Sequence, residues 1–142
     1  DLAIAYTDLE PGQRTDPLSP STTIRAVGNV AIDQLLEGES MCEDYTTATP
    51  CPNSATSTIP ADRQVFGTTT TTYGFASSSG LILSSTTPAE LELNVRKSTA
   101  TSSQESGVTY WGIEVPSSIS KAGLYTGENT FTARIAEPAD WF

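Results

Sequence analysis

Residues 90–96 read Glu-Leu-Glu-Leu-Asn-Val-Arg and give the clearest structural signal in the chain. Polar and apolar side chains alternate along this stretch, which is the period of a β-strand with one buried face. Leu91, Leu93 and Val95 share one side of such a strand, and polar or charged residues share the other. The stretch therefore predicts a strand that packs its leucine side on a hydrophobic core.

The same alternation is present in residues 125–135, and between the two stretches lies an apolar run, residues 108–115, that ends at Pro116. Shorter apolar runs separated by Gly, Pro and Ser clusters bring the total to about seven or eight strands. This pattern predicts an all-β fold, a single antiparallel β-sandwich of the immunoglobulin-like or jelly-roll type with little helix. The residues expected to form its core, or a groove in it, are Leu91, Leu93, Val95, Trp111, Ile113, Tyr125, Phe131 and Ile135.

Three further stretches carry weaker signals. Residues 31–39 are the best helix candidate, because Ile32, Leu35 and Leu36 have the i, i+3, i+4 spacing of a helix face. A threonine-rich tract that ends in Tyr-Gly-Phe predicts a strand over residues 68–75. Another short strand is expected at Leu81-Ile82-Leu83, after a turn of Ser and Gly residues.

Hydroxyl side chains dominate the composition, with 22 Thr and 17 Ser among 142 residues. Thr is β-branched and suits the exposed faces of sheets. The formal net charge is −10 at pH 7. Such a chain repels phosphate backbones, so we expect no nucleic-acid partner. No apolar run is long enough for a transmembrane helix, so we also expect no membrane insertion.

Composition divides the chain into three parts. Residues 1–9 predict an N-terminal strand, residues 10–21 a Pro-rich tether, and residues 22–142 the β-sandwich domain. Within that domain, residues 42–61 predict a surface loop, because they are rich in Pro and hydroxyl residues and poor in large apolar ones. The tether would let the first strand swing away from its own domain.

Cys42 and Cys51 are the only cysteines, and their spacing on the Pro-rich loop favours a local disulfide over the alternative of two free thiols. No histidine or further cysteine is present to complete a zinc site with them. A disulfide implies an oxidising compartment. A chain that starts at Asp1, with no apolar leader, suggests that a leader was removed. These features predict a secreted protein at the cell surface.

The absence of histidine removes the usual general base and the commonest metal ligand. Residues 118–121 match Ser-x-x-Lys, but the partner motifs of that enzyme class are missing. Glu90 and Glu92 form a carboxylate pair of the kind used in glycoside hydrolysis, yet they would share the solvated face of their strand and keep ordinary pKa values. We therefore expect no catalytic residues and no enzyme activity.

Acidic residues gather before and around Cys42, at Glu37, Glu39, Glu43 and Asp44. Carboxylate oxygens are ligands of Ca²⁺, although the spacing of a calcium-binding loop is lacking. The alternative is a solvated acidic loop. We assign no metal ligands and no cofactor from the sequence, with Ca²⁺ left as the open alternative.

Residues 110–116 read Tyr-Trp-Gly-Ile-Glu-Val-Pro, and residues 122–133 read Ala-Gly-Leu-Tyr-Thr-Gly-Glu-Asn-Thr-Phe-Thr-Ala. Together they resemble the last two strands of exported bacterial and archaeal cell-surface domains with an immunoglobulin-like or jelly-roll sandwich. The general plan is also similar to TasA-like subunits of extracellular fibres. The resemblance lies mainly in residues 108–135, implies a surface β-sandwich and export, and carries over no catalytic residue.

The first functional hypothesis is a structural subunit of an extracellular filament, pilus-like fibre or surface layer. Copies of the chain would be its partners, joined by β-strand exchange, with Leu2, Ile4 and Tyr6 plugging a neighbour's groove.

The alternative is a monomeric adhesin or carbohydrate-binding module that contacts a glycan or a host or cell surface. Exposed aromatic side chains would then form a sugar platform. The candidates for such a platform are Tyr45, Tyr110, Trp111 and Trp141.

Overall fold

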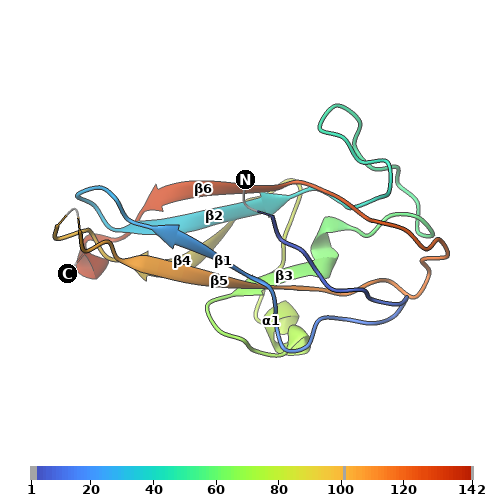
Figure 1. Ribbon diagram of the computed structural model, residues 1–142, viewed down its shortest axis with the longest axis horizontal. Helices are drawn as coiled ribbons and strands as arrows, with labels where there is room; N and C mark the ends of the chain where they lie inside the picture. The colour runs from blue at the N-terminus through green and yellow to red at the C-terminus, as the bar shows by residue number, and fades with distance from the viewer. Residues whose placement is uncertain (1–2, 101, 142) are drawn as a thin grey trace.

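The computed structural model describes residues 3–100 and 102–141 as two three-stranded antiparallel sheets, one above the other (Figure 1). The strands are β1 (Ser21–Arg25), β2 (Ile32–Gly38), β3 (Gln64–Gly67), β4 (Ala89–Val95), β5 (Ser106–Ile113) and β6 (Asn129–Ile135). The helical elements are the α-helix α1 (Tyr73–Ser78) and the 3-10 helices η1 (Ala61–Arg63) and η2 (Pro138–Asp140). One sheet has the order β1-β5-β3 and the other β4-β2-β6. The all-β sandwich prediction is confirmed, with six strands in the described residues.

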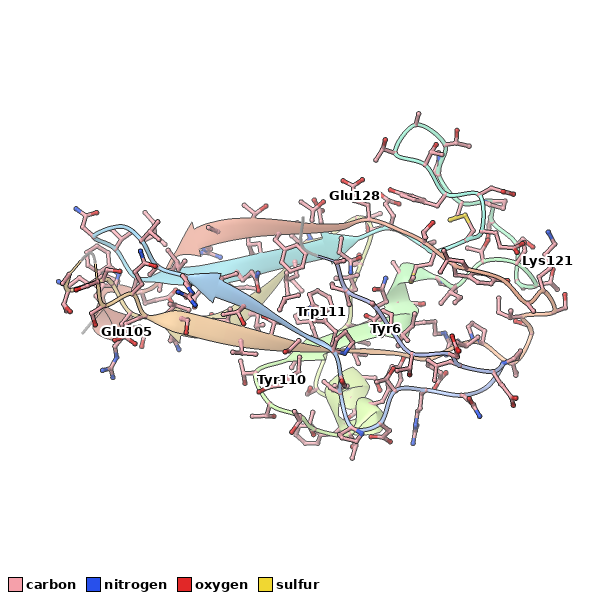
Figure 2. The ribbon with its side chains drawn as sticks, viewed as in Figure 1. Tyr6, Glu105, Tyr110, Trp111, Lys121 and Glu128 are labelled. Atoms are coloured by element: carbon pink, nitrogen blue, oxygen red, sulfur yellow. A yellow bond between two sulfur atoms is a disulfide. The ribbon has the colours of Figure 1, made fainter. Side chains whose placement is uncertain are left out.

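The core lies between the two sheets and is centred on Trp111 of β5, which Figure 2 shows between the layers. Its ring centroid is 5.7 Å from that of Phe66 on β3 and 5.5 Å from that of Phe131 on β6. The indole Nε1–H donates a 2.9 Å hydrogen bond to Thr22 Oγ1 on β1. Because its one polar group has a partner, Trp111 is fully buried at no hydrogen-bonding cost.

A second apolar cluster covers the outer face of the β1-β5-β3 sheet. It contains Leu18, Val65, Tyr73 and Ala76, of which the last two come from α1. The strand expected over residues 68–75 is therefore wrong, because residues 68–72 form no strand and Tyr73 begins a helix. Asp16 Oδ1 accepts a hydrogen bond from the Tyr73 N–H at 3.2 Å, which satisfies one of the free donors at the helix start.

The helix expected at residues 31–39 is also wrong, because Ile32–Gly38 forms β2, the central strand of its sheet. This strand pairs with β4 on one side and β6 on the other. Leu35 and Leu36 are adjacent and point to opposite faces of the sheet, so this strand lacks simple alternation and its apolar residues have the spacing of a helix face. Thr109 Oγ1 on β5 donates a 2.9 Å hydrogen bond to Gln34 Oε1, which joins the two sheets at the centre.

One predicted core residue lies outside the core. Ile135 at the end of β6 is 61% exposed, whereas Phe131 earlier on the same strand packs against Trp111. The opposing edge strand β3 has 4 residues and meets the start of β6, where Asn129 contacts Gln64. Ile135 lies at the other end of β6, away from this contact.

The disulfide between Cys42 and Cys51 is present, with an S–S distance of 2.06 Å. The loop that carries it projects from one end of the sandwich (Figure 1). Met41 and Ile59 close the base of this loop through two backbone hydrogen bonds of 2.8 and 2.9 Å. Among the residues described, no helix has the length and apolar character needed to cross a bilayer.

Candidate functional site

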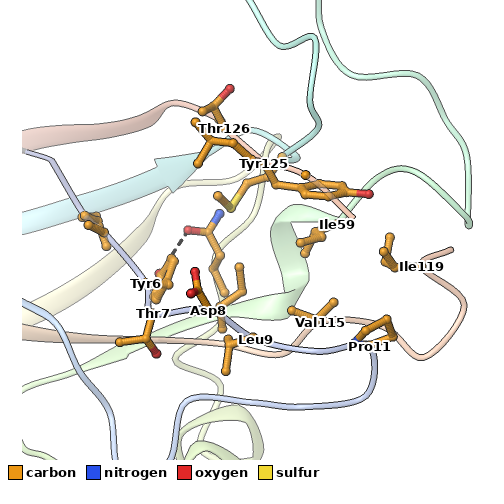
Figure 3. Close-up of a pocket in the computed structure, with 18 of the residues that line it drawn as sticks. Tyr6, Thr7, Asp8, Leu9, Pro11, Ile59, Val115, Ile119, Tyr125 and Thr126 are labelled. Atoms are coloured by element: carbon orange, nitrogen blue, oxygen red, sulfur yellow. Dashed lines mark hydrogen bonds between the residues drawn. The ribbon is translucent and has the colours of Figure 1, made fainter. Parts of the chain in front are cut away.

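A cavity of about 880 Å³ opens between the two sheets at the end of the molecule near the disulfide loop (Figure 3). One wall consists of residues 3–11, and the opposite wall of residues 119–127 together with the ends of β3, β5 and β6. Its floor is an apolar cluster of Ile59, Ile113, Val115 and Ile119. We call this cavity the groove.

Residues 3–9, which we call the leading segment, lie along one wall of the groove with Ile4, Tyr6 and Leu9 packed inward. Ile4 and Tyr6 pack against the core around Trp111, and Tyr6 and Leu9 pack against the apolar floor. Ala3, Ala5 and Thr7 are exposed. Leu2, the third residue expected to act as a plug, lies outside the described residues.

A polar bridge links the leading segment to both sheets. The Tyr6 hydroxyl donates to Gln64 Oε1 at 3.3 Å, and Asn129 Nδ2 donates to the same oxygen at 3.1 Å. Gln64 belongs to β3 and Asn129 to β6, so one amide oxygen connects the edge strands of opposite sheets. Burial, and to a smaller extent the nearby Tyr73, raise the pKa of Tyr6, so this hydroxyl stays protonated as a donor.

The backbone of the leading segment is unpaired. The strand expected at residues 1–9 is absent from its described part, and no backbone–backbone hydrogen bond joins residues 3–9 to either sheet. In the described structure β6 has one strand neighbour, β2, so its outer edge presents N–H and C=O groups without a strand partner. Side chains of the leading segment thus form one wall of the groove, while a strand edge beside it stays open.

The stretch expected to be a free tether is anchored over most of its length. Gly12 N–H donates to the Val115 carbonyl at 2.8 Å, and Thr15 N–H donates to the Ile113 carbonyl at 2.9 Å. Leu18 is 1% exposed. The leading segment joins this anchored stretch at the turn Pro11-Gly12, where the glycine has φ +84°, a value that side-chain-bearing residues rarely adopt.

The structure brings only some of the predicted groove residues to the groove. Ile113, Tyr125 and Phe131 line it, whereas Leu91 and Leu93 belong to the core around Trp111. Val95, like Leu91 and Ile113, is buried.

The polar bridge through Gln64 was missed, because a glutamine that precedes two apolar residues has no pattern of its own in the sequence. The floor residues Val115 and Ile119 were visible only as apolar positions around Pro116. Their shared location depends on chain folding that local periodicity does not encode.

The acidic residues around Cys42 do not form a metal-binding group. Glu43 pairs with Lys121 at 3.3 Å, and Glu37 and Glu39 line a different, smaller cleft. In the part of the chain that the structure describes, one group of three carboxylates is close enough to share an ion, and it consists of Asp33, Glu90 and Glu92.

The ordinary pKa expected for Glu92 is also wrong. Partial desolvation, and then the charges of Asp33 and Glu137, raise the pKa of this carboxyl. The strand face that carries Glu92 brings several like charges close together, which the sequence pattern did not indicate.

The four aromatic residues of the expected sugar platform do not come together. Trp111 is buried, and Tyr110 packs against the cluster on the other face of its sheet. Tyr45 lies in the disulfide loop, at the opposite end of the molecule from the chain end that carries Trp141 (Figure 1). Tyr45 lines a cleft of about 280 Å³ together with Glu37, Glu39 and Glu128.

Comparisons of this chain with protein-family models, with curated proteins and with solved structures found no match. The fold and the groove therefore carry the functional argument.

Proposed function

We propose that this protein is a non-catalytic structural subunit of an extracellular filament or surface layer, in which copies join by exchanging their leading segments. The observation that supports this most directly is the leading segment itself. The side chains of Ile4, Tyr6 and Leu9 pack along one wall of the groove, yet the backbone of residues 3–9 has no sheet hydrogen bonds. The segment is therefore held by side-chain packing and not by backbone hydrogen bonds to a sheet.

Exchange retains the favourable contacts and adds new ones. A leading segment from a neighbouring copy would place the same apolar side chains in the same groove. If it also aligned with the open edge of β6, each new backbone hydrogen bond would contribute about 0.5–1.5 kcal/mol. Nine extended residues span about 30 Å, so the neighbour's groove must lie within that distance of Gly12.

The proposed location is outside the cell. A disulfide between Cys42 and Cys51 is stable in oxidising surroundings, and the formal charge of −10 favours solubility among cations. The surface is rich in hydroxyl side chains, which suits an exposed β-sandwich.

Electron microscopy and light scattering of the purified full chain test the proposal. We expect the wild-type protein to form regular polymers, and Tyr6→Asp to abolish them, because a charge cannot enter the apolar groove. Ala5→Asp is the matched control, since Ala5 is the exposed neighbour on the same segment. A wild-type chain that stays monomeric at every concentration, or a Tyr6→Asp variant that polymerises like wild type, would refute the proposal.

A second variant separates loss of assembly from loss of folding. Removal of residues 1–9 leaves the groove open, and a synthetic peptide with the sequence of residues 1–9 should then bind in trans and raise the melting temperature. The same peptide with Tyr6→Asp should have no effect. Failure of the wild-type peptide to stabilise the truncated chain would show that the groove does not accept a segment from another molecule.

The cleft beside Tyr45 supports a second candidate, a surface-binding module for glycans. An aromatic ring next to Glu37, Glu39 and Glu128 offers a stacking surface and acceptors for sugar hydroxyls. We expect Tyr45→Ala to weaken glycan retention several-fold on a glycan array, while Tyr45→Phe keeps the ring and most of the binding. Equal retention by wild type and Tyr45→Ala would exclude this cleft.

A further inference from the structure

The outer face of the β4-β2-β6 sheet carries three carboxylates at its centre. One ligand oxygen from each of Asp33, Glu90 and Glu92 lies within 4.8 Å of the others. Asp33 comes from β2, and the two glutamates from β4. Glu90 and Glu92 are two residues apart, so they point to the same side of their strand.

Asp33 is an unusual member of this group because it is buried. Its exposed fraction is 0%, and its Oδ1 accepts a 2.7 Å hydrogen bond from the Asn94 backbone N–H. Its Oδ2 is equally buried and has no hydrogen-bond partner. A buried carboxylate oxygen without a donor is strongly unfavourable unless a cation or a proton neutralises it.

An irregularity in β4 produces this arrangement. The register between β2 and β4 shifts between Ile32 and Gln34, and Asn94 has a φ of +49°. The Asn94 N–H consequently points at the Asp33 side chain and does not join the strand ladder. Bulges of this kind re-aim side chains, and here the bulge places the Glu92 end of β4 beside Asp33.

The local charge is strongly negative. Arg134 on β6 pairs with Glu90 and neutralises one of the three carboxylates. Glu137 and Asp140 of the following turn add further negative charge near Glu92. At least two uncompensated negative charges therefore remain around a buried, unpartnered oxygen.

We propose that Asp33, Glu90 and Glu92 form a binding site for a divalent cation, with Ca²⁺ preferred over Mg²⁺. All three donors are hard carboxylate oxygens, which select Ca²⁺ or Mg²⁺ over zinc or copper. Oxygens that bind one Ca²⁺ lie about 2.3–2.6 Å from it, so two of them can be up to about 5 Å apart. Mg²⁺ requires a tighter octahedron, with opposite oxygens about 4.2 Å apart. The ligands come from both β4 and β2, so a bound ion would link these two strands and stabilise the sheet.

Calcium titration of the chelator-treated full chain tests the site, by calorimetry and by thermal unfolding. We expect CaCl2 to bind and to raise the melting temperature, MgCl2 to act more weakly, and Glu92→Gln to weaken calcium binding at least tenfold. Glu37→Gln removes the same charge from β2, the strand that carries Asp33, outside the group and should bind calcium as wild type does. Stabilisation that is equal in wild type and Glu92→Gln would mean general charge screening and would overturn the proposal.

Asp33→Asn supplies an independent readout. Asparagine keeps the Oδ1 acceptor for the Asn94 N–H and replaces the unpartnered oxygen by an amide that can donate to the two glutamates. We expect this variant to melt at a higher temperature than calcium-free wild type and to lose the response to calcium. A variant that is less stable than calcium-free wild type, or that still responds to calcium, would contradict the proposal.

Discussion

Replacement of Trp111 by Ala is expected to reduce the free energy of unfolding by about 3–5 kcal/mol, the range for an aromatic removed from a packed core. Trp111 is fully buried and contacts Phe66 and Phe131 from opposite sheets, so its loss leaves a void at the place where the two layers meet. Small domains have about 5–15 kcal/mol of stability in total. The variant should therefore be close to unfolding at room temperature.

Urea denaturation followed by far-UV circular dichroism measures this change without relying on the fluorescence of the removed residue. Thr22→Val is the companion variant, because it keeps the ring and removes only the acceptor of the indole N–H. That change should cost about 1–3 kcal/mol, the penalty of a buried donor left without a partner. A loss below about 1 kcal/mol for Trp111→Ala would mean that the core is not organised around this residue.

The second large effect is expected from a single added methyl group at Gly112. A Cβ there would lie 2.5 Å from Leu18 Cδ2 and 3.2 Å from Val65 Cγ2, both on buried side chains. Neither neighbour can move into solvent, so Gly112→Ala should lose about 1–3 kcal/mol through overpacking. The same denaturation experiment measures the loss.

Gly28→Ala is the matched control, because a Cβ at Gly28 would have nothing within 4 Å. This variant should stay within about 0.5 kcal/mol of wild type, as expected for a surface position. The double variant Gly112→Ala with Leu18→Val should recover part of the loss, because the smaller side chain makes room. Equal stability of Gly112→Ala and Gly28→Ala would show that the outer layer over β5 is loosely packed.

The sequence was sufficient for the fold class because strand alternation is a local property. The strands expected at residues 90–96 and 108–115 correspond closely to β4 and β5, and the disulfide follows from the only two cysteines. The helix at residues 73–78 and the strand at residues 32–38 were assigned wrongly, since in both cases tertiary contacts override local preference.

The candidate sites were less predictable for the same physical reason. Ile4 and Tyr6 could be chosen from their alternation. The lack of a strand partner for their backbone depends on the strand order, in which β6 is the edge of its sheet. Asp33 has no distinguishing neighbours in the sequence, and its meeting with Glu92 depends on a bulge in another strand. Contacts between residues about 60 positions apart leave no periodic trace.

The anchoring of residues 12–15 has a mechanical consequence for a polymer built by segment exchange. Tension on an exchanged leading segment would enter its own subunit at Gly12, which is hydrogen-bonded to the continuation of β5 at Val115. Gly12, Gln13 and Thr15 make three hydrogen bonds to residues 113–115. A pull on the leading segment along the direction of β5 would load these three hydrogen bonds together in shear. The force would then pass to β5, the strand that holds Trp111. The load path would thus run through the best-packed strand of each subunit and bypass the disulfide loop and the edge strand β1.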